Sequence, residues 1–195
     1  MSGLTSSGSG AEVVSHHVQT QPIERDYAAD EALTVLYREH ALRLTRLAYV
    51  MLGDRGAAED IVQEAFVGLH RRWGQLSDHS RAVFYLRSSV LNGCRDVLRR
   101  SNRSLTLTLV DIVPDLPGTT NPSAESAALT TEERQAVMTA IRKLPTRQRE
   151  ALVLRFYLDE PEAEIARLMG VRPGTVRSTT ARALAALGRL LEEES

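Results

Sequence analysis

Arginine, serine and threonine side chains gather in one short C-terminal run, PGTVRSTTARAL (173–184). An arginine can form paired hydrogen bonds with a guanine, and a hydroxyl can donate to a phosphate or touch a thymine methyl group. A helix face with no binding role would carry more glutamate and lysine than this run does. The run therefore favours a surface that reads DNA. The side chains expected to face solvent on such a helix are Thr175, Arg177, Ser178, Thr179 and Arg182.

The residues just before this run are spaced for a helix-turn-helix. Ala166, Gly170 and Val176 supply a small residue where two helices cross, a glycine at the turn and a β-branched anchor in the second helix. Pro173 suits the first turn of the second helix, because the N–H that proline lacks would have no partner there. Arg172 stands where Ser, Thr or Asp would cap the helix better. A plain helical hairpin without a DNA role is the alternative.

Residues for other kinds of chemistry are missing from the sequence. It has one cysteine, Cys94, and no cluster of histidines with the spacing of metal ligands. No glycine-rich phosphate loop and no Ser/His/Asp arrangement occurs in a plausible context. Glu59, Asp60 and Glu64 share one predicted helix, but the pattern around them indicates a surface. We therefore expect no enzyme activity, no cofactor, no metal site and no small-molecule substrate.

The overall charge limits how the chain can bind DNA. The formal net charge is −1 and the pI is about 6.5, whereas a free-standing DNA-binding domain usually has a pI above about 9. DNA binding is therefore expected to need a partner. No apolar run approaches the roughly 20 residues that span a bilayer, and the single cysteine favours a reducing compartment. We expect a cytoplasmic protein without membrane insertion.

The first half of the chain predicts a three-helix unit at residues 29–100. Residues 1–28 are rich in Ser, Gly and Thr, which predicts a disordered N-terminal extension. Gly53 should end the first helix and Asp54 should cap the second. A third helix is expected over 81–100. Apolar residues recur at helical spacing. The predicted buried stripe of the first helix is Leu33, Leu36, Tyr37, His40, Leu44, Leu47, Ala48 and Met51; that of the second is Ala58, Val62, Ala65, Phe66, Leu69 and Trp73.

The second half predicts another helical unit after a linker. Residues 101–128 are rich in proline and polar residues, and their alternating SLTLTLV could form only an unpaired strand. The unit at 129–195 should contain helices at 130–143, 146–158, 160–169 and 173–192. The sequence thus predicts an all-α protein in which two small helical domains are joined by a flexible linker, and the second domain contains the helix-turn-helix.

Three stretches together resemble one family. They are GDRGAAEDIVQEAFVGLHRRW (53–73), FYLRSSVLNGCRDVLRR (84–100) and the long run from Leu144 to Leu184. In this order and spacing they resemble a group IV, or extracytoplasmic-function, sigma factor of the sigma-70 family. The ending GTVRSTTARAL resembles a subgroup common in actinobacteria. The resemblance implies a subunit that binds core RNA polymerase, recognises the −10 and −35 promoter elements and assists promoter melting.

The resemblance also assigns roles to residues of the first unit. Asp60, Gln63 and Glu64 match the surface that docks on the clamp helices of the polymerase β′ subunit, although by composition alone they form only an exposed polar face. The loop 74–80 and the following helix match the part that captures an unpaired base of the −10 element. The implied −10 contacts are Gln75, Ser77, Asp78, His79, Tyr85, Asn92, Arg95, Arg99 and Arg100. Tyr85 also fits a core role, and Asp96 could orient an arginine.

The remaining implied contacts lie in the second half of the chain. The residues that match the −35-reading helix are Arg172, Thr175, Arg177, Ser178 and Arg182. The linker, with Asp111 and Asp115, occupies the place of a segment that family members thread through the polymerase. The family further implies contact with the polymerase β flap and regulation by an anti-sigma factor.

Two other readings of the sequence stay open. A stand-alone transcription regulator could use the same helix-turn-helix, but it would usually dimerise and would leave the AEDIVQEAF helix without a role. An interaction adaptor, such as an inactive sigma-like decoy, would bind polymerase or another partner and start no transcripts.

Overall fold

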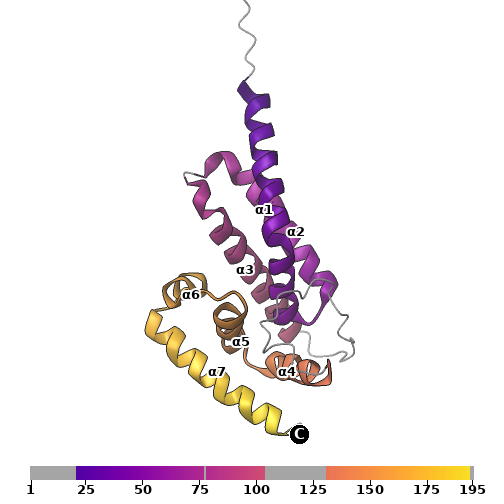
Figure 1. Ribbon diagram of the computed structural model, residues 1–195, viewed down its shortest axis with the longest axis vertical. Coiled ribbons are helices and arrows are strands. Elements are labelled where there is room, and N and C mark those ends of the chain that lie inside the picture. The colour runs from indigo at the N-terminus through magenta and orange to yellow at the C-terminus, as the bar shows by residue number, and fades with distance from the viewer. Residues whose placement is uncertain (1–20, 77, 104–130, 194–195) are drawn as a thin grey trace, which may run out of the picture.

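The computed structural model describes residues 21–76, 78–103 and 131–193, and within these ranges every regular element is a helix. The predicted all-α class is therefore confirmed. Two groups of helices, coloured from indigo to magenta and from orange to yellow in Figure 1, lie one above the other. We call the helices before residue 104 the first unit and those after residue 130 the second unit.

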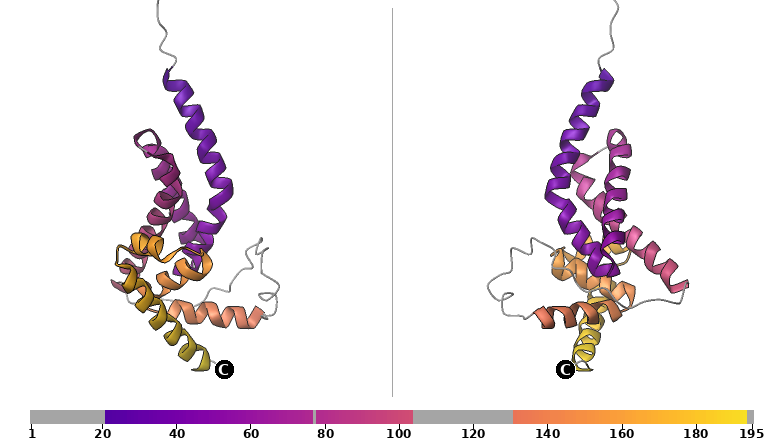
Figure 2. Two further views of the ribbon diagram at one scale, coloured as in Figure 1. Left: turned by 60° about the vertical axis from the view of Figure 1, so that its left-hand side comes forward. Right: turned by 90° about the vertical axis from the view of Figure 1, so that its right-hand side faces the viewer.

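The first unit consists of α1 (Gln21–Leu52), α2 (Arg55–Arg72) and α3 (Ala82–Arg103), with two 3₁₀ turns, η1 (Trp73–Gln75) and η2 (His79–Arg81), between α2 and α3. α1 starts at Gln21, so the extension expected at 1–28 is helical over its last residues. This stretch, QPIERDYA (21–28), contains no glycine, and Pro22 falls in the first turn, where proline is tolerated. The N-terminal end of α1 projects beyond the other helices (Figures 1 and 2).

The turn between α1 and α2 forms as its residues predict. Gly53 takes a φ of 77°, a left-handed conformation that favours glycine, and its N–H donates to Tyr49 O at 2.7 Å. The Asp54 side chain accepts from Ala57 N at 3.0 Å, which caps α2. This tight reversal places α2 antiparallel against α1.

The core of the first unit follows most of the predicted stripes and differs from them at several positions on α1 and α2. The fully buried side chains include Leu47, Met51, Leu69, Leu86, Val90, Leu91 and Cys94. Ile61, outside the predicted stripe, is also buried, because α3 approaches α2 so closely that a Cβ on Gly93 would lie 2.8 Å from Ile61 Cγ2. Tyr37, predicted to be buried, is instead 50% exposed, and its ring meets that of Phe66 in a T-shaped contact with centroids 5.0 Å apart.

The second unit contains α4 (Thr131–Lys143), α5 (Thr146–Leu152), the π-helical turn η4 (Val153–Tyr157), α6 (Glu162–Met169) and α7 (Pro173–Glu193). The expected helix at 146–158 therefore widens into a π turn in its second half. Gly170 ends α6 in the left-handed region with a φ of 66°. Its N–H donates to Arg167 O at 3.2 Å and that of Val171 to Ala166 O at 3.0 Å, the pair of bonds of a Schellman motif.

The two units pack against each other. One continuous apolar core joins residues of α1, α2 and α3 with residues of α5, η4 and α6. Arg149 of α5, which is buried, donates to Met51 O at the C-terminal end of α1 and to Leu144 O at 3.2 Å. In Figures 1 and 2 α4 lies across the lower end of the first unit. The tertiary contacts thus bring together two units that the sequence predicts only as neighbours along the chain.

Some expectations fall outside the described residues. Most of the predicted linker, including the SLTLTLV stretch, Asp111 and Asp115, belongs to the undescribed range 104–130. Among the helices described, none is both long and apolar enough to cross a bilayer.

Candidate nucleic-acid and protein interfaces

The outer face of α7 carries the residues predicted to read DNA. Arg172, Thr175, Arg177, Ser178 and Arg182 are all exposed. Thr179 was expected among them, but it is buried together with Val176 and Ala183. These three residues recur every three or four positions, which is the spacing of one helix face. The packing side of α7 is therefore one residue wider than its apolar pattern predicts.

The arginines of α7 make only weak contacts within the chain. Arg177 lies 3.3 Å from the Glu162 carboxylate of α6, and its side chain is 79% exposed. An exposed ion pair of this kind contributes less than about 1 kcal/mol. Arg182 Nε donates to Ser178 O at 3.2 Å. Both guanidinium groups can therefore exchange these partners for a base edge or a phosphate at little cost.

The loop between α2 and α3 presents aromatic and polar groups. The rings of Trp73 and His79 are in tilted contact, with centroids 4.5 Å apart and planes inclined by 55°, and Gln75 is also exposed. Asp78 Oδ1 accepts from Ser80 N at 2.9 Å and from Ser80 Oγ at 2.6 Å, and these hydrogen bonds lower the pKa of Asp78. Asp78 thus caps the η2 turn, so Gln75 and His79 are better placed to meet a base. Ser77 lies outside the described residues.

The C-terminal half of α3 carries exposed arginines. Arg99 and Arg100 are exposed, and Arg99 Nη2 donates to Asp96 at 2.8 Å, so Asp96 does orient an arginine. Near the start of α3, Tyr85 is half-buried against the core, and the Arg72 guanidinium lies 5.8 Å from its ring centroid. Tyr85 therefore has the predicted core contact, while part of its ring remains accessible.

Two other predicted −10 residues lie near the contact between the units. Arg95 of α3 donates to Asn92 Oδ1 at 2.6 Å and to Leu168 O of α6 at 3.1 Å. Its guanidinium also pairs with the carboxylate of Glu150 in α5. In this arrangement the hydrogen-bonding groups of Arg95 are directed at the second unit.

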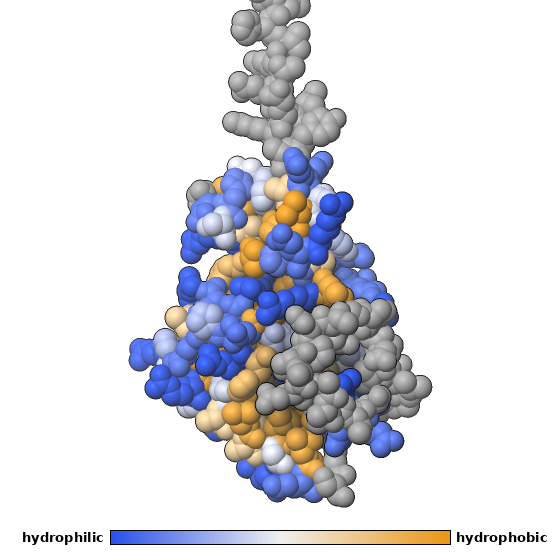
Figure 3. Space-filling view, viewed as in Figure 1, coloured by the Kyte–Doolittle hydropathy of each residue, from blue (hydrophilic) through white to orange (hydrophobic). Residues whose placement is uncertain are grey.

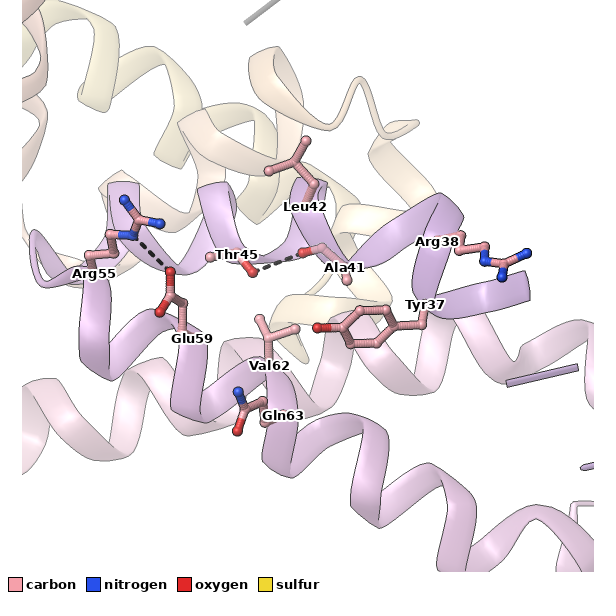
Figure 4. Close-up of a pocket in the computed structure, with 9 residues that line it drawn as sticks. All are labelled: Tyr37, Arg38, Ala41, Leu42, Thr45, Arg55, Glu59, Val62 and Gln63. Atoms are coloured by element: carbon pink, nitrogen blue, oxygen red, sulfur yellow. Dashed lines mark hydrogen bonds and ion pairs between the residues drawn. The ribbon is translucent and has the colours of Figure 1, made fainter. Parts of the chain in front are cut away.

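The outer face of α2 is acidic and lies next to a shallow hollow. Asp60, Gln63 and Glu64 are exposed. Gln63 and Val62 of α2 line the hollow together with α1 residues such as Tyr37, as Figure 4 shows. The hollow has a volume of about 470 Å³ and has polar and apolar walls. Tyr37, Leu42 and Val67 are large apolar side chains left exposed on these two helices. Such a mixed surface fits a protein partner.

Comparisons with known proteins agree with this arrangement. The family described as Sigma-70 region 2 matches residues 36–104, and Sigma-70, region 4 matches residues 134–187. The ECF RNA polymerase sigma factor SigM of Mycobacterium tuberculosis (strain H37Rv) is 34% identical over 183 residues, covering 94% of this chain and 85% of SigM. The chain belongs to the ECF group of the sigma-70 family. It is a sigma factor, a non-enzymatic subunit that directs RNA polymerase to promoters.

More distant relatives support the same family and fold. BldN of Streptomyces coelicolor, also named an ECF RNA polymerase sigma factor, is 28% identical over 175 residues, covering 89% of this chain and 66% of BldN. The fold resembles that of RpoE, solved with the anti-sigma factor NepR from Bartonella quintana, with a TM-score of 0.60 and 20% identity over 87% of this chain and 97% of that one. CnrH, solved with the cytosolic domain of CnrY, gives a TM-score of 0.59 and 22% identity over 87% and 98%.

The structure of the sigma factor adds a surface that sequence reasoning missed. Residues of α1, α4, α5, η4 and α7 line an apolar groove of about 340 Å³ that includes Met138, Phe156 and Leu184. Phe156 is 62% exposed and Leu184 is 46% exposed. In Figure 3 apolar surface gathers over α4 and α7 at the lower end of the molecule. Phe156 lies in the π turn η4, where the residues do not follow the 3.6-residue period of an α-helix. The apolar periodicity of the sequence therefore could not predict that this side chain is exposed.

No group of three or more His, Cys, Asp and Glu side chains capable of holding a metal occurs in the part of the chain that the structure describes.

Proposed function

We propose that this sigma factor uses three separate surfaces: the acidic face of α2 for core polymerase, the η1–η2 loop with α3 for the −10 element, and α7 for the −35 element. One observation carries the proposal. The same chain presents an arginine-rich, hydroxyl-rich α7 and an exposed acidic face on α2, and a stand-alone DNA-binding regulator would need only the first of these.

The core-binding surface is centred on Asp60, Gln63 and Glu64. Their exposure and their position beside the hollow between α1 and α2 support contact with the β′ clamp helices. Apolar Tyr37 and Val67, exposed on the same helices, would bury surface in such a contact and strengthen it. The charged groups then set orientation and specificity.

The −10 surface combines the Trp73 and His79 rings, which are in tilted contact, with polar Gln75. An unpaired base can stack on an aromatic ring and be recognised at its edges once it has left the duplex stack, which costs a few kcal/mol. The arginines of α3, Arg95, Arg99 and Arg100, would hold the adjacent phosphates. Because Asp78 caps η2, its assigned role is to hold the loop in shape.

The −35 surface is the outer face of α7. Arg172, Thr175, Arg177, Ser178 and Arg182 are exposed on or just before its first three turns, which is the part of a recognition helix that enters the major groove. The weak internal contacts of Arg177 and Arg182 keep both guanidinium groups available for guanine or phosphate.

Further partners are proposed from the family and from the surfaces. The apolar groove lined by Met138, Phe156 and Leu184 is suited to an apolar helix, and we assign it to the polymerase β flap. Relatives of similar fold were solved with anti-sigma factors, and we propose that this chain is also regulated by one. Because the protein would act on promoter DNA together with polymerase, we also propose that it works in the cytoplasm.

Run-off transcription tests the function directly. Purified core polymerase would be incubated with fragmented genomic DNA from the source organism, with and without this protein. New transcripts whose start sites share spaced −35 and −10 sequences are the expected result. Binding of polymerase without new start sites would favour a sigma-like decoy. Absence of polymerase binding, together with tight binding to paired half-sites, would favour a stand-alone regulator.

A further inference from the structure

An acidic residue lies beside an arginine that is proposed to read the −35 element. Glu162 is the first residue of α6, which lies beside the start of α7 (Figure 1), and Arg177 is in the second turn of α7. Arg177 Nη2 lies 3.3 Å from each carboxylate oxygen of Glu162, and Arg177 Nε lies 3.4 Å from Glu162 Oε2. The carboxylate therefore faces one edge of the guanidinium with both of its oxygens.

The other edge of this guanidinium stays open. Within the described residues Arg177 Nη1 has no hydrogen-bond partner, and the side chain is 79% exposed. Nη1 and the second hydrogen of Nη2 form another planar fork of donors. Such a fork fits the O6 and N7 acceptors of a guanine. Arg177 can thus meet a guanine while it keeps its contact with Glu162.

The negative charge of Glu162 suits base reading better than phosphate binding. Phosphate contacts depend on positive charge, which the carboxylate cancels, whereas base contacts depend on how the donors are oriented. Arg182, further along the same face, pairs with no carboxylate in the described residues. Its Nε donates to Ser178 O at 3.2 Å and its Nη2 lies 3.5 Å from Thr179 Oγ1. The pairing with a carboxylate therefore distinguishes Arg177 from Arg182.

A role in starting α6 does not account for this contact. Acidic side chains in the first turn of a helix interact favourably with its N-terminal end, and α6 has two, Glu162 and Glu164. Glu164 pairs with Arg167 of its own helix. Glu162 instead contacts a residue of the next helix, 15 positions along the chain. The two carboxylates share a helix turn, but Glu162 pairs with the DNA-facing side of α7.

Both partners of the pair stand on packed helices. Ala166 of α6 and Val176 of α7 are buried, and the turn at Gly170 joins the two helices. A side chain held on a rigid element loses less freedom when it binds. The exposed pair is weak in water, but DNA in the groove would exclude water and strengthen the hydrogen bonds. The contact is therefore suited to orient Arg177 at the moment of recognition.

We propose that Glu162 is a positioning residue, which holds the guanidinium of Arg177 in the plane needed to select a guanine of the −35 element. The inference rests on the proposed function of α7 and adds a determinant of its specificity. Glu162 acts through Arg177. Its charge also disfavours phosphate contacts by that arginine, which weakens binding to sequences without the guanine.

Base preferences measured by sequencing provide the test. Core polymerase with the full chain would be bound to a duplex DNA library randomised over both promoter elements, with core polymerase alone as background. We expect the native chain to prefer guanine at one −35 position, Glu162→Ala to reduce this preference at least about threefold, and Arg177→Ala to remove most of it. Glu162→Ala should bind sequences without the guanine at least as tightly as the native chain does, because a charge that repels phosphates is gone.

A double variant separates positioning from a general effect. Without Arg177, Glu162 has no guanidinium to orient, so Glu162→Ala with Arg177→Ala should show the same preferences as Arg177→Ala alone. Glu164→Ala is the matched control, since it removes equal charge from the same turn of α6 and should leave the guanine preference unchanged. Glu162→Gln keeps one acceptor oxygen, so its preference should lie between those of the native chain and Glu162→Ala. Circular dichroism checks that each variant folds.

The outcomes separate this inference from the proposed function. A native guanine preference in both Glu162 variants would overturn the inference. Equal loss in Glu162→Ala and Glu164→Ala would also overturn it, because charge or the start of α6 would then explain the effect. In both cases a preference that still depends on Arg177 leaves the −35 function intact. A native complex without any base preference would contradict the −35 function of α7, and the role of Glu162 with it.

A second comparison covers failure of the alanine variant to fold. Glu162→Gln and Glu164→Gln each remove one charge and preserve the shape of the side chain. A weaker guanine preference in Glu162→Gln than in Glu164→Gln supports the proposal, and equal preferences overturn it.

Discussion

At the scale of single residues, Arg177 should decide how well the −35 element is read. Among the described residues, Glu162 alone holds its exposed side chain, so Arg177 is available for a guanine. We expect Arg177→Ala to cost about 1–3 kcal/mol of discrimination, roughly a 5- to 150-fold loss in the binding constant. Transcription from promoters with a −35 element should fall, and affinity for core polymerase should not change.

The matched control for Arg177 is Arg189→Ala, which removes an exposed arginine near the other end of α7. It should leave transcription close to the native level. If Arg177→Ala affects promoters with and without a −35 element equally, Arg177 does not read that element.

Cys94 should make stability depend on pH in the alkaline range. Its folded pKa of about 12 is above the ordinary value of 9.0, so the folded state favours the protonated thiol. This contribution is fully present below pH 9 and is lost as the pH rises toward 12. Cys94→Ala introduces a small cavity but removes this titration. Denaturant melts between pH 8 and pH 11 should therefore show a steeper loss of stability in the native chain than in Cys94→Ala, and parallel curves would contradict the assignment.

At the scale of elements, the turn between α6 and α7 depends on Gly170. Its left-handed backbone suits glycine, and an added Cβ would meet open space, so the cost of Gly170→Ala should be conformational alone. We expect the free energy of unfolding to fall by about 1 kcal/mol, measured by urea denaturation.

Gly188 provides a control, because its replacement by alanine should change the free energy of unfolding in the opposite direction. It lies inside α7 with nothing near its missing Cβ. Gly188→Ala should raise the free energy of unfolding by about 0.5–1 kcal/mol, because alanine is the better helix former. If both substitutions shift stability in the same direction, backbone conformation does not explain the turn.

At the scale of the whole molecule, the acidic face of α2 should control assembly with polymerase. We expect Asp60→Lys combined with Glu64→Lys to weaken binding to core enzyme by at least about tenfold, since juxtaposed like charges cost several kcal/mol at a complementary interface. Both side chains are exposed, so the melting temperature should change little. A titration with labelled core polymerase measures the affinity.

Glu31→Lys combined with Glu193→Lys is the matched reversal at exposed carboxylates elsewhere. It changes net charge by the same amount and should leave the affinity for core enzyme nearly unchanged. Equal weakening by the two double variants would mean that overall charge, and not the face of α2, is responsible.

The local features of the fold could be predicted from the sequence because they depend on neighbouring residues. Asp54 caps α2 and Gly53 ends α1 through hydrogen bonds that reach no more than four residues along the chain. The turn at Gly170 is likewise local, because its hydrogen bonds join Gly170 to Arg167 and Val171 to Ala166. Tyr37 was predicted wrongly: it fits the apolar period, yet it lines the open hollow between α1 and α2 and stays half exposed.

The sequence by itself determined that the chain is helical, where most helices turn, and, apart from Thr179, which polar side chains of α2 and α7 face solvent, because helical periodicity and capping act over one or two turns. Only the tertiary structure decided what those faces meet. Arg95 and Glu150 are 55 residues apart, and Arg43 and Leu158 are 115 apart. No spacing rule connects such pairs, since they form only when the apolar surfaces of two units are buried together. That burial turns a predicted DNA contact into a contact within the protein.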